Sequence, residues 1–166
     1  MFDGILKKLF GDKNKKDLDE LFPVVESTNQ FSEKLINLSD DELRAKTSEF
    51  KKTLKNSCEA TQKEITDLKQ KANSDLDISQ KEAIYEKIDA LEIQENEVIE
   101  STLLEIMPDA FAVVKETARR LSKNGFLKVT ANENDQELSI KLDVVEIKGG
   151  HAIWKNSWNA AGTPVE

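Results

Sequence analysis

A seam of alternating four-residue and three-residue steps in the first half of the sequence constrains the fold most. Between Leu43 and Ala72 the residues at these steps are Leu43, Thr47, Phe50, Leu54, Cys58, Thr61, Ile65, Leu68 and Ala72. Such spacing places residues on one side of an α-helix, so the pattern predicts a diluted coiled-coil seam. A helix of about 30 residues would be on the order of 45 Å long. A second element must then cover this seam.

A second seam over residues 80–107 supplies that element. Its positions are Ile84, Ile88, Leu91, Val98 and Thr102, with Tyr85, Ile99 and Ile106 alongside. An S-x-x-E sequence, which is typical of a capping box, precedes each seam, as Ser39 with Glu42 and as Ser79 with Glu82. We therefore predict that residues 43–72 and 80–107 pack as a long antiparallel helical hairpin. The side chains predicted to be buried in it are Phe50, Leu54, Ile65, Ile88 and Leu91.

Short helices are predicted before the hairpin. In residues 1–12 one helical face is apolar and lysines lie beside it, which is typical of a basic amphipathic helix. The residues concerned are Phe2, Ile5, Leu6, Lys7, Lys8, Leu9 and Phe10. Residues 1–16 hold five lysines and two aspartates, a balance of +3. Core packing and membrane-surface docking are both open interpretations of this face.

A second helix is expected from about Lys16 to Asn37, with Pro23 near a bend or in a first turn. Its apolar residues are Leu18, Leu21, Phe22, Val25, Phe31, Leu35 and Ile36. The stretch from Leu103 to Arg120 is more apolar than one buried stripe needs, and Pro108 is expected to break it. These helices complete a body expected over residues 13–124.

The pattern of residues changes after Asn124-Gly125. Alternating and β-branched residues predict strands over 126–131, 137–147 and 151–158, with a tight turn at Gly149-Gly150. Residues 159–166 are expected to form an open tail without a closing element. The fold class predicted is therefore mainly α with a small antiparallel sheet near the carboxyl end.

Composition excludes several function classes. The net charge of -8 argues against a dedicated nucleic-acid binder, which needs clustered positive charge. Cys58 is the single cysteine, so an internal disulfide and a cysteine-based zinc site are excluded and an intracellular setting is favoured. No apolar run approaches the roughly 20 residues of a membrane-spanning helix.

No catalytic, cofactor-binding or metal-binding residues are predicted. The sequence holds no glycine-rich phosphate loop, nucleophile elbow or H-E-x-x-H motif. His151 follows two glycines and is expected in an exposed turn, while Cys58 lies on the seam as a small buried residue. Acidic residues 40–42 are expected to stabilise a helix start, and Arg119-Arg120 a helix end. Trp154 and Trp158 are expected to pack in a hairpin.

Three collinear stretches resemble a known family. "LSDDELRAKTSEFKKTL", from Leu38, is similar to the L-S-D-E-E-L-x-x-K-T-x-E-F segment near the start of SecA, the ATP-driven motor of bacterial preprotein translocation. "IMPDAFAVVKETARR", from Ile106, resembles its L-x-P-E-A-F-A-V-V-R-E-A-x-x-R segment, and "MFDGILKKLFGDKNKKDL" resembles its opening helix. The family's H-F-D-V-Q-L-x-G-G and G-E-G-K-T sequences do not occur here.

The resemblance implies an amino-terminal part of a SecA with two insertions. One insertion, the helical hairpin, covers about residues 55–102, and the β-rich one covers 126–158. The tail at 159–166 would then lead to a motor domain. By the same resemblance the longer parent uses ATP and Mg²⁺, whereas this part holds no cofactor and is expected to be inactive alone.

The resemblance also implies partners and a location. They are the SecY channel complex, preproteins, an anionic lipid surface and the remainder of SecA, with a homodimer possible. The location implied is the cytoplasm, peripheral on the cytoplasmic face of the inner membrane. Residues 2–10 would contact membrane or channel, and the motor domain would pack on Phe111, Val114, Arg119 and Arg120. Without the resemblance, the sequence indicates a self-contained coiled-coil interaction module.

Overall fold

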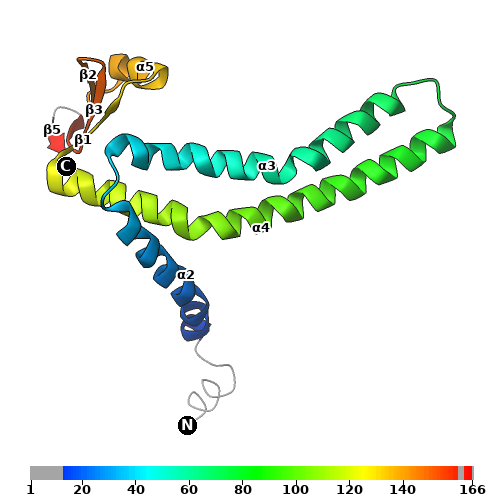
Figure 1. The fold of residues 1–166 in the computed structure, drawn as a ribbon, viewed down its shortest axis with the longest axis horizontal. Helices are drawn as coiled ribbons and strands as arrows, with labels where there is room; N and C mark the ends of the chain where they lie inside the picture. Colours follow the sequence, from blue (N-terminus) through cyan, green and yellow to red (C-terminus); the bar gives the residue numbers. More distant parts are fainter. Residues whose placement is uncertain (1–12, 161–162, 166) are drawn as a thin grey trace, which may run out of the picture. The chain divides into compact units, whose positions relative to one another are not determined.

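The chain is mainly helical, with small antiparallel sheets near its carboxyl end (Figure 1). The computed structural model describes residues 13–160 and 163–165. Within these ranges the helices are α2 (Lys13–Leu35), α3 (Asp40–Ala72), α4 (Ile78–Asn124) and α5 (Glu133–Lys141). The strands are β1 (Phe126–Thr130), β2 (Val145–Lys148), β3 (His151–Lys155), β4 (Trp158–Ala160) and β5 (Thr163–Val165). The predicted fold class is confirmed.

The chain divides into two compact units. One unit is Thr47–Met107, and the other joins the residues up to Lys46 to those from Pro108 onward. Helices α3 and α4 therefore each contribute to both units. No helix within the described residues is both long enough and apolar enough to cross a membrane.

The first unit, Thr47–Met107, is the predicted antiparallel hairpin, with α3 and α4 joined by a short turn. Ile65, Ala72, Ile84 and Ile88 form its core, and Leu68, Leu76 and Leu91 pack against them. Phe50 and Leu54 are half-buried, Cys58 is buried, and Thr47 is exposed. The seam is thus confirmed at most positions. Exposed ion pairs such as Lys69 with Glu92 lie beside this core and add little stability.

One of the two predicted capping boxes is confirmed and the other is wrong. Ser39 and Glu42 form the predicted capping box before α3. At α4 the box is instead Asp77 with Gln80: the Gln80 N–H donates to Oδ1 of Asp77. The prediction of Ser79 with Glu82 is wrong because the helix begins earlier, at Ile78, so Ser79 already lies in the first turn.

The second unit contains α2 and the carboxyl-terminal part of α4. Leu35, Leu43 and Ala112 form its helical core, with Phe31, Leu38 and Val113 packed against them. Pro23 lies inside α2, and Pro108 lies inside α4, which continues to Asn124. The predicted break at Pro108 is therefore wrong. The boundary between the two units nevertheless falls at this proline, which removes one backbone donor from the helix.

A three-stranded antiparallel sheet with strand order β1-β3-β2 follows α4. Gly125, at a positive φ of 75°, ends α4 and donates its N–H to the Leu121 carbonyl. Gly149 and Gly150 also have positive φ angles and form the predicted turn between β2 and β3. His151 is half-buried and pairs within the sheet, so the expectation of an exposed turn residue is wrong.

Only the end of the strand predicted over 137–147 is a strand. Residues 133–141 form α5, which begins with a capping box of Asn132 and Asp135. The apolar alternation at 138, 140 and 142 suggested one strand face. In fact Leu138 packs on the sheet core, while Ile140 is 87% exposed. The tail at 159–166 was expected to hold no closing element, but its described residues pair in β4 and β5, where Asn159 opposes Pro164 and Ala160 opposes Thr163.

Candidate interaction surfaces

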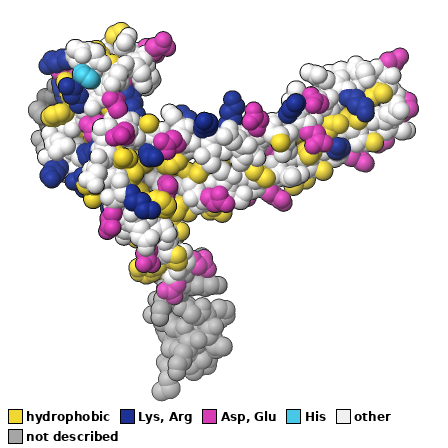
Figure 2. All heavy atoms as spheres, viewed as in Figure 1, with side chains coloured by type: hydrophobic (Ala, Val, Ile, Leu, Met, Phe, Trp, Pro, Cys, Tyr) yellow, Lys and Arg dark blue, Asp and Glu magenta, His cyan; other side chains and the backbone are white. Residues whose placement is uncertain are grey.

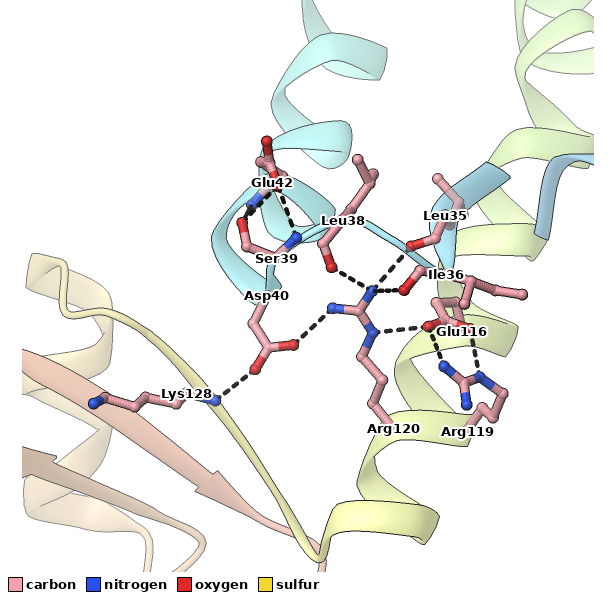
Figure 3. A network of polar contacts seen from close by, with 10 residues as sticks. All are labelled: Leu35, Ile36, Leu38, Ser39, Asp40, Glu42, Glu116, Arg119, Arg120 and Lys128. Carbon is pink, nitrogen blue, oxygen red and sulfur yellow. Dashed lines mark hydrogen bonds and ion pairs between the residues drawn. The ribbon is translucent and has the colours of Figure 1, made fainter. Parts of the chain in front are cut away.

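A buried guanidinium joins three helices of the second unit (Figure 3). Arg120, on α4, donates from Nη1 to Oδ1 of Asp40 over 2.7 Å. Its Nη2 donates to the carbonyl oxygens of Leu35 and Leu38, at the end of α2 and in the turn that follows. The Leu35 carbonyl also accepts from the Leu38 N–H in this turn, so Arg120 adds to the capping of α2 while it binds the first residue of α3.

Glu116 is fully buried one turn before Arg120 and completes this polar junction. Its carboxylate accepts from Nε and Nη2 of Arg119 and from Nε of Arg120. These donors, those of Arg119 foremost, lower the pKa of Glu116 to about 2 against the opposing effect of its burial. The two arginines are therefore neutralised within the chain, which argues against an anion site here.

The acidic start of α3 also binds the free edge of β1. The Ala131 N–H donates to Gly150, so odd-numbered positions of this strand bond to β3 and even-numbered ones face outward. The outward N–H of Lys128 donates to Oδ2 of Asp40, and that of Thr130 to Oδ1 of Asp41. Hydrogen bonds from Thr130 also lower the pKa of Asp41. These carboxylates thus stabilise a helix start and satisfy a sheet edge.

A second ion pair fixes the sheet to α3. Arg44 binds the buried carboxylate of Asp135 through both terminal nitrogens, at 2.6 and 2.7 Å. The indole N–H of Trp154 donates to the same carboxylate, and together these donors, Arg44 first, lower the pKa of Asp135. Trp154 packs in the core of the sheet, as expected, whereas the Trp158 side chain lies outside the described residues.

Neither ion-pair cluster resembles a catalytic site. Every carboxylate in them is bound by a guanidinium, a backbone amide or an indole of the chain itself. Among the described residues, no group of three histidine, cysteine or acidic side chains could hold a metal ion. Their arrangement can position helices and a sheet, but it presents no nucleophile or general base to a substrate.

One carboxyl group in this unit is poorly satisfied. Oδ1 of Asp109 is buried and has no hydrogen-bond partner among the described residues. Burial raises the pKa of this carboxyl, against the opposing charges of Lys34 and Lys46. Asp109 follows Pro108 in the apolar stretch from Leu103 to Arg120. No sequence signal indicated that its carboxyl would be buried.

The four residues predicted to contact the motor domain differ in their solvent exposure. Phe111 is 55% exposed and Val114 is 64% exposed on α4, so both are accessible to a partner. Arg119 is exposed, although its guanidinium binds Glu116. Arg120 is buried, and its donors are occupied within the chain. The outward part of this surface is therefore Phe111, Val114 and Arg119.

The amino-terminal half of α2 carries a second exposed apolar surface. Leu18, Leu21, Phe22 and Val25 are 52–62% exposed, and Ile36 is also exposed. Figure 2 shows hydrophobic side chains gathered over this helix on the viewed face. The helical core formed by the described residues covers only the other half of α2.

The predicted membrane contacts lie outside the described residues. They are Phe2, Ile5, Leu6, Lys7, Lys8, Leu9 and Phe10. Sequence reasoning also missed Glu116, Asp135 and Thr130 as residues that hold the unit together. Two signals were available: the i,i+4 spacing of Glu116 and Arg120, and the N-x-x-D sequence that begins α5.

Comparisons with known proteins identify relatives along nearly the whole chain. The family model described as SecA DEAD-like domain matches residues 6–130. Proteins named "Protein translocase subunit SecA" are 45% identical in Christiangramia forsetii and 43% identical in Cytophaga hutchinsonii, each over 98% of this chain. One from Bacteroides fragilis is 35% identical over 97% of it. No solved structure matches the chain.

The alignments show how much of each relative the chain matches and where the two predicted insertions fall. The chain spans about 15% of the length of these relatives. Both segments predicted as insertions, 55–102 and 126–158, fall within the aligned 163 residues of the Christiangramia forsetii protein. That relative therefore has counterparts of the helical hairpin and of the sheet.

Proposed function

This chain belongs to the SecA family, and we propose that it is the amino-terminal part of a longer protein translocase, here called the parent protein. In this proposal the parent couples ATP hydrolysis, with Mg²⁺, to the movement of preproteins through the SecY channel. The observation that carries it is similarity over 98% of the chain to proteins named as SecA translocase subunits. The chain itself would serve docking and packing, because it has no glycine-rich phosphate loop.

We assign the docking role to residues 2–10. Their apolar face and two lysines, in a segment with a balance of +3, suit an anionic bilayer or the adjacent channel. Each lysine near such a surface contributes about 1 kcal/mol, and salt screens this attraction. The parent would thus be peripheral on the cytoplasmic face of the bacterial inner membrane.

We assign contact with the rest of the parent to Phe111, Val114 and Arg119. The exposure of the two apolar side chains supports this role, because contiguous exposed apolar surface usually marks an interaction site. The buried polar junction supports it as well, since Arg120 fixes the part of α4 that follows Val114 to α2 and α3.

Vesicle flotation tests the docking role. The intact chain is expected to float with vesicles of anionic lipid at low salt and to be released at high salt, and a version without residues 1–11 is expected to remain unbound. Ile140→Asp is the matched control, because Ile140 is 87% exposed on α5 and lies outside the proposed contact. Equal flotation of intact and truncated chains would overturn the docking role.

A further inference from the structure

The described residues form two small antiparallel sheets, which together have four strand edges. In the three-stranded sheet the edges are β1 and β2, and in the two-stranded sheet both β4 and β5 are edges. An edge presents backbone N–H and C=O groups that have no partner in their own sheet, so it accepts a further strand unless the protein closes it. The four edges differ in how they are closed.

The chain closes the β1 edge with charged side chains. The outward N–H of Lys128 donates to Asp40 over 2.9 Å, and that of Thr130 donates to Asp41 over 2.7 Å. The Thr130 carbonyl accepts from Nη1 of Arg44 over 3.3 Å. These side chains occupy the positions that a further strand would need, so β1 is not a site for one.

The chain also covers the β2 edge. The Lys155 N–H of β3 donates to the Val144 carbonyl, so Val145 and Ile147 are the outward positions of β2. Val145 is nevertheless only 3% exposed, and Ile147 packs against the same core as Leu138 of α5. A further strand could not reach this backbone without displacing what covers it.

A proline closes the β5 edge. Pro164 lies opposite Asn159 in the two-stranded sheet. Antiparallel strands alternate between pairs that exchange two N–H···O=C bonds and pairs that exchange none. Because proline has no N–H, the pair of Asn159 and Pro164 is of the second kind. Pro164 therefore faces outward at a position where it cannot donate, as is usual for proline in an edge strand.

The same register leaves β4 as the open edge. The N–H and C=O of Asn159 point away from β5, toward the side where a third strand would lie. The two-stranded sheet consists of two strands of three residues each, and so small an isolated ladder is marginally stable in water. A third strand at β4 would satisfy these outward groups and stabilise the ladder.

We propose that β4 accepts, at Asn159, a strand from the part of the parent protein that follows Glu166. The inference rests on the proposed function, which makes this chain part of that longer protein. The length of the relatives supports this occupant, because the chain spans about 15% of it. The position of the edge supports it as well, since β5 ends at Val165. A strand that follows closely is held near β4 by its own connection, whereas a separate chain must bind from solution.

This pairing would give the rest of the parent a second point of contact. Only Asn156 and Ser157 separate β3 from β4, and the Asn156 N–H donates to the carbonyl of Gly125, which follows α4 directly. A strand on β4 is therefore tied through this short link to the helix that carries Phe111 and Val114.

Hydrogen exchange at single amides, measured in the isolated chain and in the parent, tests the pairing. The Asn159 N–H is expected to exchange at least about tenfold more slowly in the parent, because only there does it donate to a third strand. The Ala131 N–H, which donates to Gly150 within the sheet, is the internal control and should exchange at equal rates. Equal rates for Asn159 in the two proteins would overturn the proposal, as would an Asn159 amide already protected in the isolated chain.

Other occupants of the edge would give different results. Protection that increases with the concentration of the parent would indicate a second copy, and protection that appears only with a preprotein would indicate the transported chain. Either result would overturn the proposal. Preprotein transport by a parent in which Asn159 is unprotected would overturn this inference alone and leave the proposed function standing.

Substitution of Asn159 separates backbone pairing from side-chain packing. Asn159→Pro removes the outward donor, whereas the matched control Asn159→Ala keeps it. In the parent, Asn159→Pro should speed exchange of the Ala160 N–H, which bonds to β5, by about tenfold, and Asn159→Ala should change it less than about twofold. Equal effects of the two substitutions in the parent, or an equal effect of Asn159→Pro in the isolated chain, would overturn the third strand.

Discussion

Arg120 on α4 binds the carboxylate of Asp40 at the start of α3, although the two residues are 80 positions apart in the chain. Asp40 in turn accepts from the backbone N–H of Lys128 on β1. Together with Glu116 these contacts hold two helix ends and one sheet edge in one network. The network explains why Arg120 is buried and Asp40 is half-buried, although each belongs to a charged pair that looks like surface charge in the sequence.

Replacing Arg120 by alanine should lower the free energy of unfolding by about 3–5 kcal/mol, because the buried Glu116, the Asp40 carboxylate and the Leu35 and Leu38 carbonyls all lose a donor. Arg119→Ala is the matched control and should cost less, about 1 kcal/mol, since that side chain is 44% exposed. Urea unfolding followed by tryptophan fluorescence is the measurement, because both tryptophans belong to this unit. Loss of less than 1 kcal/mol for Arg120→Ala would contradict a structural role for the junction.

Stability should fall in acid through Glu116. Its folded pKa, about 2, lies below the ordinary value of 4.5, so its contribution is present above pH 4.5 and is lost as the pH falls toward 2. Glu116→Gln should therefore flatten the dependence of unfolding free energy on pH in this window. Lowered pKa values of Asp41 and Asp135 will leave a residual slope. Identical slopes for the variant and the original chain would refute the assignment.

The edge of β1 should open when its carboxylate cap is removed. Asp41→Ala leaves the Thr130 N–H without its acceptor, so its hydrogen exchange should accelerate by about fivefold to tenfold, equivalent to roughly 1 kcal/mol. The Ala131 N–H, which donates to Gly150 within the sheet, is the internal control and should change little. Equal acceleration of both amides would show general loosening of the sheet in place of a local cap.

Asp109→Asn should stabilise the chain at neutral pH or leave it unchanged. Because burial raises the folded pKa of this carboxyl, ionisation opposes folding above that pKa, and the penalty disappears as the pH falls. The unpartnered Oδ1 suggests a gain on the order of 1 kcal/mol when the charge is removed. Thermal unfolding at pH 7 and pH 4 measures it. A clear loss of stability at pH 7 would mean that the ionised Asp109 carboxylate makes a stabilising contact.

The sequence predicted the helical hairpin because its signals are local. Heptad-like spacing and the Ser39-Glu42 capping box act within a few residues. It failed at residues 137–141, where the strand-like alternation was followed and the local capping signal of Asn132 and Asp135 was missed. The packing of Leu138 on the sheet, a tertiary contact, also favours the helix. The polar junction was not predictable, because Arg120 and Asp40 meet only once α2, α3 and α4 have packed.

The exposed apolar surfaces show the same limit of prediction from the sequence. Periodicity marked Leu18, Phe22, Phe111 and Val114 as members of apolar faces, but it does not say what covers each face. Leu35 and Ala112, on the same two helices, found partners within the chain. Leu18, Phe22, Phe111 and Val114 remain exposed among the described residues. The contacts proposed for such surfaces therefore rest on family membership together with exposure.

The most direct test of the central claim, that this chain is a working part of a protein-translocating motor, is preprotein transport by the parent protein into inner-membrane vesicles. We expect ATP-dependent transport, a loss of about tenfold or more with Phe111→Asp and Val114→Asp together, and full activity with Ile140→Asp, if the contact contributes at least 1.4 kcal/mol. Absence of ATP-dependent transport by the parent, or equal rates for all three proteins, would contradict the account.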